Sequence, residues 1–472
     1  MRIAIIGGGA GGVLTALALL RTATTADDII QIEPAVLAEG VAYATTSDQL
    51  LLNVRASNMS AYADQPGHFV AWLAQTHPTA DGDAFVPRSW YAVYLRDTLT
   101  QARAQSAGQY THIASAVIDA IPAIHGATLV LANGSTIDAD EVILAIGHNQ
   151  PTNPLARWMP ASSRIIAGYD WERIGRDIPA DAAVVIIGTG LTMVDSVVTL
   201  LSNGHRGSIT AYSRRGYEPR THVPRVHTAS PFSRADGQRP LSDLLREFRS
   251  AVARAAADGV PWQAVIDSLR PHTQGLWQQF GTTTQRRFLR HLRAYWDVHR
   301  HRIAPEVAAH VSRARATGQL RIITGRATAA QLIPDNITLT VRTAAGAVVL
   351  TAAYIINCTG PSTDFGSLEA PLIVALRNRG LLNPDALRLG IANGIDARLL
   401  DRSGQTIPWL WAIKIQFGRE SSCWYRAPGS TVSATGNGYG FGFSLRITTP
   451  RTAETVSQSS YLLFPSFRRA VS

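Results

Sequence analysis

The N-terminal stretch of the chain alternates short apolar runs with a glycine-rich turn. "RIAII" predicts a strand that is buried on both faces, because four apolar residues follow one another. The glycine run and the apolar stretch "VLTALALL" that follow predict a tight turn and a helix. "DIIQIE" predicts a second strand and ends at Glu33. Strand, turn, helix and strand in this order are typical of a βαβ unit.

The first turn carries the glycine pattern of a dinucleotide-binding loop, G-x-G-x-x-G. The first glycine of the pattern permits the tight turn, the second lets a pyrophosphate approach the backbone, and the third lets helix and strand pack closely. The start of the helix offers free N–H groups to the phosphates. Glu33, about 20 residues further on, can accept hydrogen bonds from a ribose diol. The predicted contacts in this loop are Gly7, Gly8, Gly9, Gly11 and Gly12.

A second loop repeats this plan about 180 residues later. "AAVVIIG" predicts a strand and "LTMVDSVVTLL" a helix, and Gly188, Thr189 and Gly190 form the turn between them. Met193 stands where the third glycine would be, so the close packing of helix and strand is relaxed.

The strand that follows the second loop ends in Ser213, Arg214 and Arg215 instead of an acid. A hydroxyl and guanidinium groups accommodate the 2′-phosphate of NADP(H), whereas an acid pairs with a free ribose diol. The alternative is that both arginines belong to a solvated basic turn. The loop upstream favours NADPH.

Two further stretches resemble each other and follow the two loops. Residues 112–147 predict short strands with a turn at Asn133-Gly134 and a buried strand that runs into Gly147. Residues 320–360 show the same order and end in Gly360. The sequence therefore predicts an α/β fold with two Rossmann-like dinucleotide-binding domains, each with a β-meander.

Residues 236–318 have a helical pattern and predict an insertion. Leu241, Leu244, Phe248, Val252 and Ala255 form an apolar stripe that ends at Gly259, and Phe288, Leu292, Tyr295 and His299 share a face of a second helix. In "WDVHRHR", His299 and His301 point to different sides of a helix, so we expect a hydrogen-bonded core histidine at His299 and no metal site. The arginine-rich face opposite predicts a solvated surface or an anion site near the cofactor.

Composition and charge narrow the function further. The formal net charge is +10, which suits anionic ligands such as phosphates, and no nucleic-acid-binding signature accompanies it. Cys358 and Cys423 form no disulfide framework and no CxxC pair, which favours a reducing compartment. An N-terminal signal peptide is the alternative to the first strand, but the glycine run argues against it. Since no apolar run is long enough to span a bilayer, we expect a cytoplasmic protein without a membrane partner.

Several motifs together resemble a bacterial FAD/NAD(P)-binding family whose relatives include flavin-dependent urate hydroxylase and aspartate N-monooxygenase. They are "RIAIIGGGAGG…IE", "GVAYATTSDQLLLNVRASNMSAY", "FVPRSWYAVYL", "AIGHNQP", "IIGTGLTMVD", "SRRG", "WDVHRHR" and "INCTGPSTDF". The resemblance implies that the first loop holds FAD and the second NADPH. It also implies that residues 51–62 lie beside the flavin ring, with Asn53 and Met59 as contacts.

These patterns predict a division of the chain. The first part of the FAD-binding domain covers residues 1–165, the NADPH-binding domain 166–349 with its insertion at about 236–318, and a return segment of the FAD-binding domain 350–414. Residues 415–472 depart from the family pattern, and we expect an atypical, poorly ordered tail with one short strand at "FSLRI".

The resemblance implies a flavin monooxygenase that uses NADPH and O₂ to hydroxylate a small polar substrate, such as an amine or an amino-acid-like molecule. Two alternatives stay open: an NADPH:acceptor reductase without oxygenation, and a nucleotide-binding protein without turnover. No G-x-S-x-G elbow, P-loop lysine or Cys–His motif supports nucleophilic catalysis. Catalytic residues, substrate and oligomeric state are not specified by the sequence.

Overall fold

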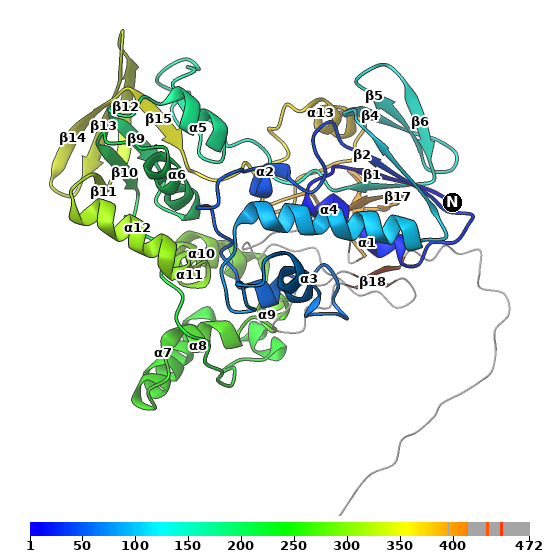
Figure 1. Cartoon of the computed structure of the whole chain (residues 1–472), viewed down its shortest axis with the longest axis horizontal. Coiled ribbons are helices and arrows are strands. Elements are labelled where there is room, and N and C mark those ends of the chain that lie inside the picture. The colour runs from blue at the N-terminus through cyan, green and yellow to red at the C-terminus, as the bar shows by residue number, and fades with distance from the viewer. Residues whose placement is uncertain (395, 414–430, 434–443, 447–472) are drawn as a thin grey trace, which may run out of the picture.

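The computed structural model describes residues 1–394, 396–413, 431–433 and 444–446, and Figure 1 shows their arrangement. Two α/β modules lie side by side, and a group of helices extends below the second module. The prediction of an α/β fold with two dinucleotide-binding modules, β-meanders and a helical insertion is confirmed.

The first module is built on a six-stranded sheet with the order β16-β17-β7-β1-β2-β3. All neighbours are parallel except β16 and β17. Apolar side chains of β1 point to both faces, since Ile3 and Ile5 pack toward two helices and Ala4 and Ile6 pack toward the meander and a third helix. The strands are β1 (Arg2–Ile6), β2 (Asp28–Ile32), β3 (Gln109–Ile113), β7 (Glu141–Leu144), β16 (Arg398–Leu400) and β17 (Thr406–Ala412). The covering elements are α1 (Ala10–Leu20) and α4 (Arg88–Gln105) on one face, and β4 (Val117–Pro122), β5 (Ala127–Leu131), β6 (Thr136–Ala139) and α13 (Pro371–Asn378) on the other.

The second module repeats this architecture on a five-stranded parallel sheet with the order β11-β10-β9-β15-β8. Helices cover one face and a β-meander the other, as the paired patterns of the sequence predict. The strands are β8 (Ile165–Ala167), β9 (Val184–Ile187), β10 (Ile209–Ser213), β11 (Leu320–Thr324) and β15 (Tyr354–Asn357). The covering elements are α5 (Trp171–Asp177), α6 (Leu191–Ser202) and α12 (Pro305–Ala316) on one face, and β12 (Arg326–Leu332), β13 (Ile337–Thr343) and β14 (Gly346–Ala352) on the other.

Two elements pack in a different part of the structure from the one to which the predicted division of the chain assigns them. Strand β15, which falls in the return segment that we expected from residue 350, pairs with β8 and β9 of the second sheet. Helix α12, which falls in the expected insertion, packs on the second sheet through Val307 and Val311. Both belong to the second module by their contacts.

The helical insertion follows β10 and hangs below the second module in Figure 1. The apolar stripe that begins at Leu241 is borne by α7, which ends before Gly259 as expected. The second expected helix is interrupted at Leu292, so it forms two short helices. The elements of the insertion are η2 (Arg234–Gln238), α7 (Leu241–Ala257), α8 (Trp262–Ser268), α9 (Thr273–Gln279), α10 (Thr282–His291) and α11 (Arg293–Arg300).

The remaining elements connect or follow the modules. They are α2 (Gly40–Tyr43), η1 (Ala56–Asn58), α3 (His68–Thr76), β18 (Thr431–Ser433) and β19 (Ser444–Arg446). Strand β19 lies within "FSLRI", where the sequence predicts a strand, and pairs antiparallel with β18. The prediction that the rest of residues 415–472 is poorly ordered lies outside the described residues.

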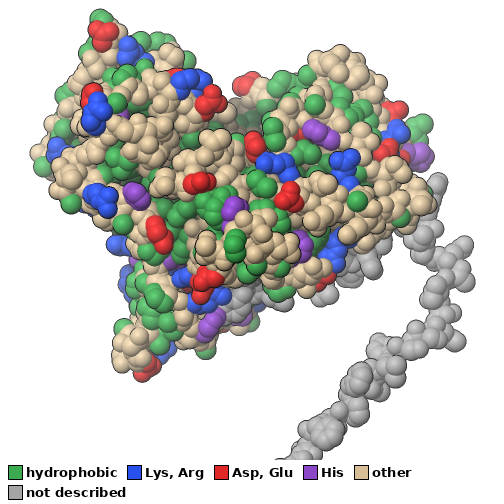
Figure 2. Space-filling view, in the orientation of Figure 1, with side chains coloured by type: hydrophobic (Ala, Val, Ile, Leu, Met, Phe, Trp, Pro, Cys, Tyr) green, Lys and Arg blue, Asp and Glu red, His purple; other side chains and the backbone are tan. Residues whose placement is uncertain are grey.

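Charges of both signs are interspersed on the face that Figure 2 shows, rather than gathered in one basic patch. Among the described residues, no helix is long and apolar enough to cross a membrane.

A buried ion pair joins the two modules. Arg88, the first residue of α4, donates from an Nη atom to Oδ2 of Asp195 on α6 at 2.8 Å, and its Nε donates to the carbonyl of Leu51 at 3.0 Å. Both side chains are nearly buried, with 10% and 13% of their surface exposed. Burial raises the pKa of Asp195, and the charge of Arg88 opposes this shift. The pair therefore holds α4, residue 51 and α6 in one arrangement.

We expect Arg88→Met to lower the free energy of unfolding by about 3–5 kcal/mol, because it leaves the Asp195 carboxylate buried without its partner. The double variant Arg88→Met/Asp195→Leu should recover most of this loss. The control is Arg176→Met, which removes exposed ion pairs with Glu172 and Asp177 and should cost less than about 1 kcal/mol. Urea unfolding measures all three, and an equal loss in Arg88→Met and the control would contradict the role of the pair.

Candidate cofactor-binding loops and cleft

The first glycine loop is shaped by close backbone contacts at two of its glycines. Gly7 has φ +117°, in the region that favours glycine. A Cβ atom at Gly7 would overlap the carbonyl oxygen of Ala145, and one at Gly12 would overlap the carbonyl oxygen of Gly7. The first and third glycines of the pattern are therefore required by the packing of the loop itself.

Gly9 lies in a different environment. Its backbone is extended, with φ −63° and ψ −177°, and a Cβ atom there would meet only Gly40 Cα, at 3.5 Å. It precedes the N-terminus of α1, where the structure shows no side-chain cap and no acidic residue in the first turn. Free N–H groups at an open helix start bind phosphates. This cradle fits a pyrophosphate.

Glu33 lies at the end of β2 and contacts the same loop. Its Oε2 accepts a hydrogen bond from the backbone N–H of Gly8 at 2.7 Å, and its Oε1 accepts from Ala35 N–H at 3.0 Å. Gly8 is close packed, since a Cβ atom there would lie 2.5 Å from Glu33 Cγ. The structure thus brings together Glu33 and the loop, as the fingerprint requires. Gly11 lies in the first turn of α1, where its carbonyl accepts from the Thr15 hydroxyl.

The second loop reproduces this design after β9, the central strand of the second sheet. A Cβ atom at Gly188 would overlap the carbonyl oxygen of Cys358, which follows β15 just as Ala145 follows β7. A Cβ atom at Gly190 would meet nothing within 4 Å, so this position is open like Gly9. Met193 is fully buried in the core of the second module. Gly147 and Gly360, the predicted turn glycines, have φ +63° and +84°.

The residues expected at a 2′-phosphate differ in how they are held. The Ser213 hydroxyl lies 2.8 Å from Thr189 Oγ1 and accepts from Gly216 N–H at 2.9 Å. Arg215 donates to the carbonyls of Arg290 and His291 and lies over the Tyr295 ring. Arg214 is exposed and forms no hydrogen bond or ion pair with a described residue. Ser213 and Arg214 are therefore the two available to a phosphate.

A cleft of about 170 Å³ lies between the modules. It brings together Asn53 and Met59, the two residues that the resemblance implied beside a flavin, with Leu191 at the start of α6. Met59 is 1% exposed and therefore forms part of the floor. The cleft thus adjoins the start of α6 and the segment that the resemblance implied beside a flavin ring.

Histidine and arginine side chains form the other wall of the cleft, and none of the described residues that line it is acidic. They are Arg88, His148, His222, Arg270, Arg300, His301 and Arg302. The "WDVHRHR" motif therefore ends in the cleft, where we expected a solvated face around Arg300. Among the described residues no group of acids, cysteines and histidines is arranged to hold a metal.

Arg302 is the most deeply buried of these cations, with 2% of its surface exposed. One of its Nη atoms donates to both carboxylate oxygens of Asp267 at 2.6 Å, whereas its Nε has no partner among the described residues. Asp267 also accepts from Arg270. Burial would raise the pKa of Asp267, but the charges of Arg270 and Arg302 hold this pKa below its ordinary value. Two guanidinium groups therefore share one carboxylate.

His222 joins this wall to the candidate flavin contact. Its Nε2 donates to the carbonyl of Asn53 at 3.0 Å, and its backbone N–H donates to the carbonyl of Ile303. Burial, and then the charge of Arg302, lowers the pKa of His222 to about 3. The imidazole is neutral near pH 7 and positions residue 53. Two further bonds, Arg55 to Val223 O and Arg225 to Ser57 Oγ, hold the same two segments together.

His299 and the two cysteines were also singled out in the sequence. The Nδ1 of His299 lies 2.7 Å from the carbonyl oxygen of Tyr295, as expected for a hydrogen-bonded histidine. It is only partly buried, because it borders a pocket in the insertion. Burial raises the pKa of Cys358 to about 12, so this thiol is protonated near neutral pH. Cys423 lies outside the described residues.

The sequence reasoning missed His222, Arg270 and Arg302. His222 and Arg270 belong to no motif, since they come from a loop and from the segment just after α8, and Arg302 is the last residue of "WDVHRHR", where attention fell on the histidines. The one available signal was Arg302, a charged residue directly before the apolar pair Ile303-Ala304 that opens the next core helix.

Comparison with known proteins agrees with this geometry. Residues 4–149 match the model of a family described as FAD-NAD(P)-binding. No curated protein matches the chain.

Solved structures share the fold across most of the chain. An ornithine N-hydroxylase from Kutzneria sp. 744, solved with reduced FAD, NADP⁺ and L-ornithine, is 15% identical with a TM-score of 0.56, over 88% of this chain and 91% of that one. The L-lysine 6-monooxygenase from Pseudomonas syringae is 14% identical with a TM-score of 0.57, over 87% and 91%. The cadaverine monooxygenase from Erwinia amylovora, bound to FAD, is 10% identical with a TM-score of 0.58, over 87% of each chain. The chain therefore has the two-module fold of these flavoprotein monooxygenases, with an FAD-NAD(P)-binding region at residues 4–149.

Proposed function

We propose that the protein is an FAD- and NADPH-dependent monooxygenase that hydroxylates a small polar substrate in the cleft between its modules. The observation that carries the proposal is the pair of open glycine positions, Gly9 and Gly190, on loops that both lie near the cleft. Leu191, which lines the cleft, follows Gly190, and α2, whose Ala42 and Tyr43 line it, begins at Gly40 beside Gly9. The family match of residues 4–149 supports FAD at the first loop, and the shared fold supports the arrangement of two dinucleotides.

When bound, the flavin would accept a hydride from NADPH and activate O₂ for transfer of one oxygen atom. The chain's own residues bind and orient. The first loop and the start of α1 hold a pyrophosphate, and Glu33 accepts hydrogen bonds from the ribose. His222 fixes the backbone of Asn53 beside the ring without carrying a charge. Buried Met59 excludes water from the floor.

The charges of the cleft favour a substrate with an acidic group. Arg270 and Arg302 share the single carboxylate of Asp267, and no described acidic residue lines the cleft. A guanidinium group with a free N–H binds a carboxylate well, whereas a second ammonium group would be repelled there. We therefore propose an amine that carries a carboxylate. This proposal includes the resemblance to the family of aspartate N-monooxygenase and urate hydroxylase. Aspartate has both groups, an amine and a carboxylate.

Replacement of Gly9 tests the flavin site separately from the fold. We expect Gly9→Ala to lose most of its bound FAD, because the methyl group meets the pyrophosphate. It should melt at the temperature of the unmodified protein freed of flavin, because a Cβ atom there has room. Gly12→Ala should instead destabilise the protein, since its Cβ atom would overlap Gly7 O. Flavin absorbance of the purified proteins and thermal unfolding give both readouts. Full flavin occupancy in Gly9→Ala would rule out this cradle.

Replacement of Arg214 tests the coenzyme preference. We expect the unmodified protein to prefer NADPH, and Arg214→Ala to raise the KM for NADPH about tenfold or more with little change for NADH. Arg215→Ala is the matched control, and its effect should be smaller because Arg215 is engaged by the carbonyls of residues 290 and 291. Equal use of NADPH and NADH by the unmodified protein would contradict the assignment.

The reaction is tested by reducing the holoprotein with NADPH without oxygen and then mixing it with ¹⁸O₂ and a candidate substrate. We expect ¹⁸O in the product from amines that bear a carboxylate, such as aspartate, and little or none from cadaverine. Mass spectrometry of the product and a peroxide assay measure the coupling. Reduction with no ¹⁸O incorporation from any amine would indicate the NADPH:acceptor reductase, and no reduction at all would indicate a nucleotide-binding protein without turnover.

A further inference from the structure

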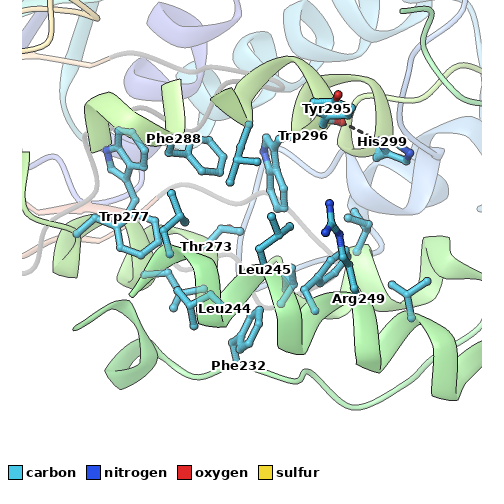
Figure 3. A pocket seen from close by; sticks show the side chains of 18 of the residues that line it. Phe232, Leu244, Leu245, Arg249, Thr273, Trp277, Phe288, Tyr295, Trp296 and His299 are labelled. Atoms are coloured by element: carbon cyan, nitrogen blue, oxygen red, sulfur yellow. Dashed lines mark hydrogen bonds between the residues drawn. The ribbon is translucent and has the colours of Figure 1, made fainter. Parts of the chain in front are cut away.

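The helical insertion contains an apolar pocket of about 610 Å³, within the range of small-molecule sites. Figure 3 shows it between α7 below and α10 and α11 above. Its walls carry aromatic and branched apolar side chains, and only a few of them are fully buried. The aromatic rings include those of Phe232, Phe248, Trp262, Trp277, Phe288 and Trp296. Because such rings are left partly uncovered, an apolar molecule that fills the pocket would bury them and lower the free energy.

Two polar groups in this pocket have no partner among the described residues. The indole N–H of Trp296 is buried and donates to no described atom. Arg249, on α7, is the one arginine, lysine or acidic side chain of the lining; it is exposed and forms no ion pair with a described residue. In Figure 3 its guanidinium group rises from α7 toward Trp296 and His299. Of these two groups Arg249 is the one that a ligand can reach, and an arginine at the rim of an apolar pocket attracts an anionic group of a bound molecule.

We propose that this pocket binds a monoanionic amphiphile, a molecule with an apolar body and one carboxylate. The apolar body fills the space between α7 and α10, with Phe232, Trp277 and Phe288 around it. The carboxylate lies at the α11 side, where it accepts hydrogen bonds from Arg249. One acid matches the single unpaired cation, and a neutral or cationic amphiphile leaves that cation without a partner.

The pocket is separate from the cleft between the modules, and Trp262 forms the wall between them. Its ring lines the pocket, while Arg302 of the cleft lies over it at 6.0 Å from the ring centroid. The neighbouring residues of α8 divide in the same way, since Ile266 faces the pocket and Asp267 pairs with Arg302. The site therefore requires no flavin chemistry and is independent of the proposed function.

The test is equilibrium binding to the full-length holoprotein, with dodecanoate as the probe and dodecan-1-ol and dodecylamine as its neutral and cationic counterparts. We expect saturable binding of one dodecanoate below its micelle-forming concentration, with a change in tryptophan fluorescence, and binding at least about fivefold weaker for both counterparts. Isothermal titration calorimetry provides the stoichiometry.

Two variants locate the site. Arg249→Gln should weaken dodecanoate about five- to tenfold and leave dodecan-1-ol unchanged. The matched control is Arg246→Gln, one turn away on α7, where the arginine pairs with Asp243 on the surface. Its binding should equal that of the unmodified protein. The proposal is overturned if none of the three probes binds, if all bind alike, or if Arg249→Gln and Arg246→Gln behave identically.

Discussion

The geometry of the cleft depends on the contact between Arg88 and Asp195. Arg88 begins α4, Asp195 lies in α6 just after the second glycine loop, and the ion pair between them lies across the boundary between the modules. Arg88 also binds the carbonyl of Leu51, the residue that opens the segment beside the proposed flavin ring. Because a buried charge is tolerated only with its partner in place, the pair specifies one relative position of the modules.

The second set of boundary contacts uses backbone acceptors in place of carboxylates. His222 and Arg55 reach carbonyl oxygens of the opposite module, and Arg225 reaches the hydroxyl of Ser57. Such contacts align the segments without adding negative charge to the cleft. The arginine-rich wall therefore keeps its positive potential close to the place where the substrate is proposed to bind.

Local sequence patterns predicted the parts of the structure that depend on neighbouring residues. Glycine spacing, apolar strands and Glu33 all act within a single βαβ unit, so nearly all of the first loop could be predicted from the sequence. The wall of the cleft is different, because His222, Arg270 and Arg302 meet only after the insertion has folded back on the first module. The interruption at Leu292 was missed for a similar reason, since the apolar positions Phe288, Leu292, Tyr295 and His299 fit one helix as well as two. Periodicity reports the face of a helix and not the packing that bends it.

Strand β17 has a consequence for the way the chain is made. It pairs with β7 through Leu410, Trp411 and Ala412, and the Trp411 indole donates to the buried carboxylate of Glu141 at 2.6 Å. The whole second module is inserted between these two strands in the sequence, so below it is called the guest and the first module the host. During synthesis from the N-terminus, the guest can fold as soon as β15 has left the ribosome, while the host still has β7 as an unpaired edge. Strand β17, which is synthesised last, must then pair with the edge of β7 that has been exposed throughout. We therefore expect completion of the first sheet to be the slow and aggregation-sensitive step of folding.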